Sequence, residues 1–408
     1  MSRPLSTAST SATPPAAAVL QELLLRNHRD HHIEYRDYLS NHLVHHLGAL
    51  YFLGASGKRL EECYAKHSEL EPSIPTDERV TDENWEQYLG AKRNYCGLVS
   101  YFTSLIDKQP LSAVLSNYIP RLIPGIHGAA LHPLIHLGYA CELNCPIIFA
   151  EALAYCTFAY LRVLGPTAAV TSAGDLTILE ILDRVRRDER LKEETIFGAG
   201  QGKRLGFQKK VAQVVQNGSG ILAKYGAMWK QDVDPSRALH ELIKAVTVLL
   251  PNTCRVPESR PGTPQLDFFV LHGLTSTYAV QQILQHRDLQ PLFQDQPELQ
   301  GRLLREEWMS LLVVYVTQGR PEIDLSRQIT HAGTGEEAWA EIRQLGIRTN
   351  DEHATKAVHS LWQWRQQFAE IEGEPDMYLR AALAVKQMVM DIEIEDGSDN
   401  WNYKGVGW

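Results

Sequence analysis

The chain reads GIHGAALHPLIHLGYACE at residues 125–142, a segment that combines small and apolar residues with three histidines. Pro133 has the fixed φ angle of a first helical turn, so we predict a helix that begins near His132 and continues through Tyr139. His132 and His136 are four residues apart and face the same side of that helix. Imidazoles in so apolar a segment are expected to be buried, as core residues or as ligands.

The composition narrows the class of protein. The 408 residues are 44% hydrophobic, which is enough for a large buried core, and the net charge of −9 argues against binding to nucleic acid or to an anionic membrane surface. No apolar run approaches the length of a transmembrane helix. The six cysteines form no CxxC pair, so we expect reduced thiols in a cytoplasmic protein.

Helical periodicity extends through most of the chain. Residues 1–18 are rich in Ser, Thr, Pro and Ala and are predicted to be disordered. Apolar residues then recur at helical spacing, as at Leu43, Leu47 and Leu50, and alternating strand patterns are almost absent. We therefore predict an all-α fold in which residues 19–408 form a single compact multi-helix domain.

One glycine-rich segment resembles a nucleotide-binding loop without meeting its requirements. Residues 198–204 read GAGQGKR, so Lys203 stands where GxGxxG needs its third glycine. Phe197 and Arg204 replace the first glycine and the final Ser/Thr of a Walker A loop. The segment is therefore interpreted as a plain loop. Because HExxH and GxSxG are also absent, a hydrolase or a classical flavoprotein has no support in the sequence.

Four histidines occur in apolar helical segments that are far apart in the sequence, namely His42, His132, His272 and His353. Metal ligands in a helical bundle come from separate helices in this way, and imidazole is a good ligand for Fe, Zn, Cu and Ni. Lys356 faces the same side of its helix as His353, but an ammonium group has no lone pair for a metal. Taken alone, Lys356 is interpreted as a surface lysine. From the residues alone, metal ligands and ordinary core histidines remain alternative interpretations.

Several segments together resemble the questin oxidase family of fungal aromatic-polyketide pathways. The matching strings, in chain order, are NHLVHHLGALYFLGA at 41–55, HPLIHLGYACE at 132–142, LHGLTS at 271–276, YVTQGRPEI at 315–323, DEHATKAVHSLW at 351–362 and GVGW at 405–408. No single string is diagnostic, but their shared order across the chain makes the resemblance specific. It implies that residues 19–408 form a questin oxidase-like domain with a buried metal site between helices.

The resemblance also implies an activity. One branch of the family is a non-heme iron dioxygenase that opens an anthraquinone ring with O2, and its iron(II) is held by four histidines and a carboxylated lysine. Carried over residue by residue, the ligands are His42, His132, His272, His353 and Lys356. The CO2-derived carbamate on Lys356 is an anionic oxygen donor, and it forms on the neutral amine that burial favours.

Other members of the family resemble Baeyer–Villiger oxygenases acting on anthraquinones. NADPH is then a further candidate cofactor, as the reductant that converts the quinone to the reactive hydroquinone, either directly or through a quinone-reducing partner enzyme. The sequence offers no Rossmann signature for it, and we predict no separate cofactor-binding residues. An NADPH-linked Baeyer–Villiger oxygenase is therefore the second hypothesis, and a non-catalytic helical scaffold without metal is the third.

The side chains around the expected ligands receive predicted roles. His136 and Tyr139 are predicted to be catalytic, within a pocket for a polycyclic aromatic substrate. The remaining neighbours are expected to line the pocket or to orient ligands by hydrogen bonds, and these are His45, His46, His127, Asn41, Asp351 and Glu352.

Overall fold

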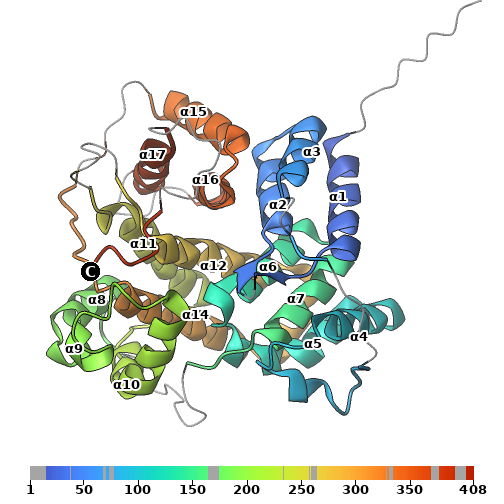
Figure 1. The fold of residues 1–408 in the computed structure, drawn as a ribbon, viewed down its shortest axis with the longest axis horizontal. Coiled ribbons are helices and arrows are strands. Elements are labelled where there is room, and N and C mark those ends of the chain that lie inside the picture. The colour runs from blue at the N-terminus through green and yellow to red at the C-terminus, as the bar shows by residue number, and fades with distance from the viewer. Residues whose placement is uncertain are drawn as a thin grey trace, which may run out of the picture.

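The computed structural model describes residues 15–36, 38–67, 70–72, 78–163, 174–232, 234–256, 258, 264–327, 329, 334–368, 376–390 and 401–408. Within these residues, β structure is limited to isolated bridges and one short hairpin, in which β1 (Glu34–Tyr35) pairs antiparallel with β2 (Leu39–Ser40). The remaining regular structure is helical and forms one compact domain (Figure 1). The prediction of an all-α fold is confirmed.

The α-helices occur throughout the described part of the chain. In chain order they are α1 (Ala16–Asp30), α2 (Leu43–Leu53), α3 (Gly57–Lys66), α4 (Tyr95–Lys108), α5 (Leu111–Leu122), α6 (His132–Leu143), α7 (Pro146–Phe158), α8 (Ile178–Arg187), α9 (Glu193–Ile196), α10 (Phe207–Ala227), α11 (Pro235–Asn252), α12 (Phe268–Gln285), α13 (Gln290–Asp295), α14 (Glu298–Thr317), α15 (Gly335–Arg348), α16 (Glu352–Gln367) and α17 (Met377–Met390). In the described part of the chain, none of these helices has the length and apolarity needed to cross a membrane.

The first helix begins ahead of its predicted boundary. The prediction of disorder for residues 1–18 is wrong for Ala16–Ala18, which form the first turn of α1. Alanine has the highest helix propensity, and these residues lead directly into the amphipathic sequence VLQELLL, so the helix extends through them. Residues 1–14 lie outside the described part of the chain.

Helices α6 and α12 cross the middle of the molecule (Figure 1). α12 packs against α6, α11, α14 and α16, and α6 is also covered by α2 and α7. Both are therefore buried on nearly every side, which explains why their sequences lack a continuous polar face. Side chains from α2, α6, α12 and α16 can meet in the interior.

Two glycines let these central helices approach one another closely. At Gly138 of α6, an added Cβ atom would lie 2.3 Å from the Cβ atom of Ala279 on α12. At Gly48 of α2, it would lie 2.9 Å from the ring of Tyr139 on α6. Because packed interiors leave no room for an extra carbon at such distances, a side chain at either position would push neighbouring helices apart.

A buried carboxyl group joins α12 to α14. Ser276 and Thr277 of α12 donate hydrogen bonds to Oε1 of Glu307 at 2.6 and 2.9 Å. The other oxygen, Oε2, is buried without a hydrogen-bond partner among the described residues. Burial therefore raises the pKa of Glu307 to about 7, although the two hydroxyl donors oppose the shift.

This raised pKa makes stability depend on pH. Between the unfolded pKa of about 4.3 and the folded value near 7, the folded chain binds more protons than the unfolded chain, so the free energy of unfolding falls as the pH rises. Replacing Glu307 with Gln removes this contribution. We expect chemical denaturation at pH 5 and pH 8 to show a smaller pH effect in Glu307→Gln, by on the order of 2 kcal/mol. Glu298→Gln, an exposed change on the same helix, is the control and should match wild type.

Candidate metal centre

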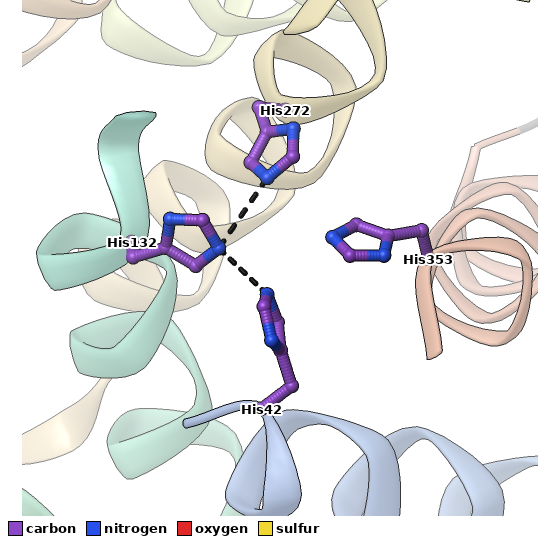
Figure 2. Close-up of side chains that lie close together, drawn as sticks. All are labelled: His42, His132, His272 and His353. Carbon is purple, nitrogen blue, oxygen red and sulfur yellow. Dashed lines mark hydrogen bonds between the residues drawn. The ribbon is translucent and has the colours of Figure 1, made fainter. Parts of the chain in front are cut away.

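Four histidines from different parts of the chain converge in the interior (Figure 2). His42 immediately precedes α2, His132 begins α6, and His272 and His353 lie in α12 and α16. Each offers one ring nitrogen, and these four atoms lie within 4.8 Å of one another. The exposed fraction of each residue is 9% or less. The structure thus brings together the four histidines singled out in the sequence, and we call them the histidine cluster.

Two members of the cluster have their ring orientation fixed by the backbone. Nδ1 of His132 donates to the carbonyl oxygen of Ala129 at 2.5 Å, and Nδ1 of His272 donates to that of Phe268 at 2.7 Å. Since a carbonyl oxygen can only accept, both protons reside on Nδ1 and each Nε2 keeps a lone pair. Imidazoles that ligate metals are held in the same way, with one nitrogen hydrogen-bonded and the other bare.

The bare nitrogens point at each other. Nε2 of His132 lies 3.4 Å from Nε2 of His272 and 2.7 Å from Nε2 of His42. Two lone pairs at such separations repel unless a proton or a metal cation lies among them. In addition, Nε2 of His353 is buried without a partner among the described residues. The donor set of the cluster therefore fits a metal ion that accepts imidazole nitrogen.

The turn before α6, which positions His132, has a strained backbone. Ala129, Ala130 and Leu131 have positive φ angles of 44°, 53° and 69°. The left-handed region costs an L-residue roughly 1–2 kcal/mol. The backbone here is pinned from outside, because a Cβ atom at Gly128 would lie only 1.6 Å from the carbonyl oxygen of Ala159. Such strain is common at functional sites, and here it brings the Ala129 carbonyl to the imidazole it orients.

Burial keeps the cluster uncharged. It lowers the pKa of His42, His132 and His272 well below the ordinary value, and neighbouring charges add to the effect. It also lowers the pKa of His353 to about 4. The imidazoles are therefore neutral at physiological pH, which is the protonation state that binds a metal.

Acidic side chains support the cluster from α16. Oε1 of Glu352 lies 3.3 Å from Nδ1 of His353 and 3.7 Å from Nδ1 of His42. Asp351 caps the helix by accepting hydrogen bonds from the backbone N–H groups of His353 and Ala354. Glu352 therefore lies where it can orient two imidazoles, whereas Asp351 positions His353 through the backbone.

Asn41 has a different role from the one expected. Its side-chain oxygen accepts a hydrogen bond from the backbone of Leu43, and its amide nitrogen donates to Asn27. Asn41 therefore anchors the start of α2 to α1, and it positions His42 only through the backbone.

Lys356 is fully buried, so its interpretation as a surface lysine is wrong. Its Nζ atom has no hydrogen-bond partner among the described residues. Burial lowers the pKa of Lys356 to about 8, against the opposing charges of Glu352 and Asp351. The amine lies close enough to the cluster to lower the pKa of each of its four histidines. Burying an amine without a hydrogen-bond partner is costly, so Lys356 is placed to bind a group from outside the described residues.

His136 and Tyr139 adjoin the cluster through His45. Nδ1 of His136 lies 3.0 Å from Nε2 of His45, and its Nε2 lies 3.0 Å from Oε2 of Glu151. The ring of Tyr139 stacks on His45 with centroids 5.2 Å apart, and its hydroxyl lies 3.4 Å from Nδ1 of His359. Neither side chain is one of the converging four, and their catalytic roles stay predictions.

His46 and His127 have local partners outside the cluster. His46 lies 3.2 Å from the thiol sulfur of Cys63, beside His67, in a second group with metal-ligand composition. Burial raises the pKa of Cys63 to about 12, so this thiol is protonated and is satisfied by the hydrogen bond to His46. His127 bonds to Ser310 at 2.6 Å and Glu306 at 2.9 Å on α14. Both histidines were expected to line the pocket or to orient ligands, and the structure instead gives them partners outside the cluster.

Sequence reasoning missed Phe268, which lies next to the cluster. The ring of Phe268 lies 4.6 Å from that of His272, 4.4 Å from that of His353 and 4.3 Å from that of Tyr403, centroid to centroid. Trp401 donates from Nε1 to Asp351 at 2.7 Å and is 2% exposed. The C-terminal tail therefore packs against the cluster. A phenylalanine in an apolar helix looks like a core residue, and no sequence signal separates a core phenylalanine from one that adjoins a cluster of histidines.

Comparison with known proteins identifies relatives for most of the chain. A family model described as Questin oxidase-like matches residues 39–361, a range that includes the histidine cluster and Lys356. The Baeyer-Villiger oxidase mdpL of Emericella nidulans is 26% identical, over 95% of this chain and 91% of its own. The Baeyer-Villiger oxidase GME11358 of Pestalotiopsis microspora is 26% identical over 84% and 80%. The questin oxidase of Aspergillus fumigatus is 25% identical over 88% and 83%.

Removal of any one converging nitrogen should empty the site. We expect elemental analysis to find about one metal ion per chain in wild type, with zinc replacing iron in some preparations because imidazole accepts both. His42→Ala, His132→Ala, His272→Ala and His353→Ala should each reduce this content sharply. His286→Ala, in which a buried imidazole bonded to Asn144 is removed, should retain the metal. A folded protein without metal in wild type, or with wild-type content in all four variants, would contradict the assignment.

Proposed function

Because the chain belongs to the questin oxidase-like family, we propose that it is a non-heme iron-dependent oxygenase that cleaves a ring of an anthraquinone-type polyketide. The names of its relatives, questin oxidase and Baeyer-Villiger oxidase, support an oxidoreductase. The observation that carries the iron proposal is the convergence of neutral imidazole nitrogens with facing lone pairs at His132 and His272. A non-catalytic scaffold would have no use for so costly an arrangement.

The residues that would hold the iron are His42, His132, His272, His353 and Lys356. When bound, iron(II) would supply the one-electron chemistry with O2 that no amino-acid side chain provides. The protein's contribution is to keep the imidazoles neutral and oriented, and to exclude water from the cluster by burial.

Lys356 would complete the ligand set as a carbamate. Its amine reacts with CO2 only when neutral, and the burial that lowers its pKa to about 8 provides a substantial neutral fraction near physiological pH. Carboxylation would also replace the buried positive charge of Lys356 by a negative charge. A carbamate beside the imidazoles would attract a bound metal cation, whereas an ammonium group would repel it. The unpartnered Nζ atom is consistent with a group that acquires its partner after folding.

The substrate would enter beside Phe268 and Tyr403. Tyr403 is 43% exposed and Phe268 is partly buried, so this side of the cluster faces solvent. Aromatic side chains at such an entrance suit a flat polycyclic substrate, which gains both apolar burial and favourable ring contacts. The buried Tyr139 lies on the side of His45, on which its ring stacks.

Hydrogen-bonded side chains would carry protons between solvent and His45, whose ring lies 6.0 Å from that of His42 in the cluster. From His45 the chain continues to His136 at 3.0 Å, to Glu151 at 3.0 Å and to His28 at 2.7 Å. The side chain of His28 is 21% exposed. Burial raises the pKa of Glu151, but the hydrogen bonds from His136 and His28 outweigh it and keep the carboxylate ionised. An ionised acceptor between two imidazoles can pass a proton in either direction.

A Baeyer–Villiger oxygenase is the second candidate, favoured by the names of two relatives. The two activities differ in electron balance. A ring-cleaving dioxygenase places both atoms of O2 in the product, with all electrons taken from the reduced substrate. A Baeyer–Villiger oxygenase inserts one oxygen atom and reduces the other to water with two electrons from a reductant such as NADPH.

Isotope labelling separates these activities. A hydroxylated anthraquinone is chemically reduced, freed of excess reductant and supplied with ¹⁸O₂ and enzyme in the absence of NADPH. We expect O2 consumption and a ring-opened product that carries two labelled oxygen atoms by mass spectrometry. One labelled atom together with a strict requirement for NADPH would establish the Baeyer–Villiger activity instead.

Substitutions of Lys356 test its role as a ligand. Lys356→Arg should abolish turnover, because guanidinium stays charged and cannot form a carbamate. Lys356→Glu provides a carboxylate on a shorter stem, so we expect partial iron retention with slow turnover. After acid treatment, bicarbonate should restore wild type, more effectively as the pH rises through about 8, and should have no effect on Lys356→Glu. Turnover in Lys356→Arg equal to that of wild type would refute the proposal.

Neutralising Glu151 tests the proton path. Glu151→Gln keeps the shape of the side chain but cannot relay a proton, so we expect kcat to fall by about 10²-fold with unchanged iron content. Glu34→Gln is the matched control, since it neutralises another buried carboxylate. Glu34 is not a member of the path and pairs instead with Lys92, whose Nζ atom lies 2.7 Å from Oε1. A kcat that falls equally in both variants, or in neither, would show that the path has no catalytic role.

A further inference from the structure

A pocket of 640 Å³ lies at the C-terminal end of α8, where the segments that follow α11 and α14 meet the C-terminal tail. It contains no residue of the histidine cluster. Its lining is notable for charge, since it includes the four arginines Arg186, Arg255, Arg320 and Arg327. Pockets of several hundred Å³ with a few convergent polar groups are typical of small-molecule sites.

Two of these arginines are held in place by backbone carbonyl groups. Nη1 of Arg320 donates to the carbonyl oxygens at the end of α8, those of Val185, Arg186 and Asp188, at 3.3, 3.2 and 2.8 Å. Nη2 of Arg327 donates to the carbonyl oxygen of Cys254 at 3.2 Å. A carbonyl group fixes a guanidinium without neutralising it, so both positive charges remain available to an anion.

The same two arginines have unused donors. The Nε atoms of Arg320 and Arg327 are buried and have no hydrogen-bond partner among the described residues. A buried N–H group without an acceptor is costly, so these two arginines lack hydrogen-bond acceptors that a ligand could supply. Burial also lowers the pKa of Arg320, although the charges of Asp188 and Glu189 oppose the shift.

The carboxylates in the lining compensate only part of the charge. Glu322 pairs with Arg186 at 3.2 Å, but its side chain is 74% exposed and can move into solvent. Asp324 is turned toward Ser326, from which it accepts hydrogen bonds at 2.6 and 3.0 Å. Four guanidinium groups and two carboxylates leave two positive charges in one pocket of a chain whose net charge is −9.

We propose that this pocket binds the phosphate group of a small phosphorylated molecule about the size of a mononucleotide. A phosphate ester provides close to two negative charges on a single group, and arginine forks match its oxygens with paired, charge-assisted hydrogen bonds. The volume exceeds what a bare phosphate fills, so the remainder of the molecule would occupy the rest of the pocket. This site is independent of the oxygenase activity proposed for the histidine cluster.

Calorimetric titration of the full chain tests the proposal. The probes are adenosine monophosphate, adenosine, inorganic phosphate and citrate. We expect adenosine monophosphate to bind, adenosine to bind at least about tenfold more weakly, and inorganic phosphate to compete with the nucleotide. Equal binding of adenosine and its monophosphate, absence of nucleotide binding, or binding of citrate alone would each overturn the proposal.

Substitutions at the rim locate the binding. Arg255→Gln and Arg186→Gln leave the carbonyl contacts of Arg320 and Arg327 intact, and each should weaken nucleotide binding by roughly tenfold, the loss expected for one charge-assisted hydrogen bond. Arg237→Gln, at a residue whose side chain is 76% exposed outside the pocket, is the control and should bind as wild type does. Iron content should stay unchanged in all three variants. Nucleotide binding that is insensitive to both rim substitutions would place the ligand elsewhere and refute the assignment.

Discussion

Repulsion between converging imidazole lone pairs is the constraint on which the interior depends. His132 and His272 donate their Nδ1 protons to backbone carbonyls, so their Nε2 atoms face each other bare at 3.4 Å. Left without a cation or a proton, that contact is unfavourable in a medium of low dielectric constant. The surrounding helices must therefore hold the rings in place until a positively charged ion relieves the repulsion. The helices packed around α6 and α12 provide this restraint.

Backbone geometry, more than side-chain chemistry, sets the precision of the cluster. Gly138 and Gly48 permit contacts between α6 and its neighbours that no side chain would allow. Three successive residues with positive φ angles end at Leu131 and turn His132 inward. Such features lower stability locally, and they persist because the packed neighbours leave the chain no alternative. The C-terminal tail adds a further restraint, since Trp401 bonds to Asp351 at the start of α16.

Charge is distributed unevenly in this protein. The imidazoles of the cluster are neutral because burial lowers their pKa values. A separate pocket gathers four arginines around two carboxylates. This pocket concentrates positive potential within a chain of negative net charge, so it attracts an anion. In contrast, the path from His45 to His28 contains an ionised carboxylate between imidazoles, which suits the movement of protons.

The sequence by itself determined the all-α fold and the start of α6 at His132, because periodicity and a first-turn proline are local properties. It also made candidates of the four histidines that meet, and the family resemblance implied their role as ligands. It did not reveal the burial of Lys356, since helical spacing shows which side chains share a face but not what covers that face. The hydrogen bonds from His136 to Glu151 and from Glu151 to His28, and the arginines around one pocket, join residues far apart in the chain. Only tertiary packing decided these, because contact between distant segments depends on how every intervening helix is placed.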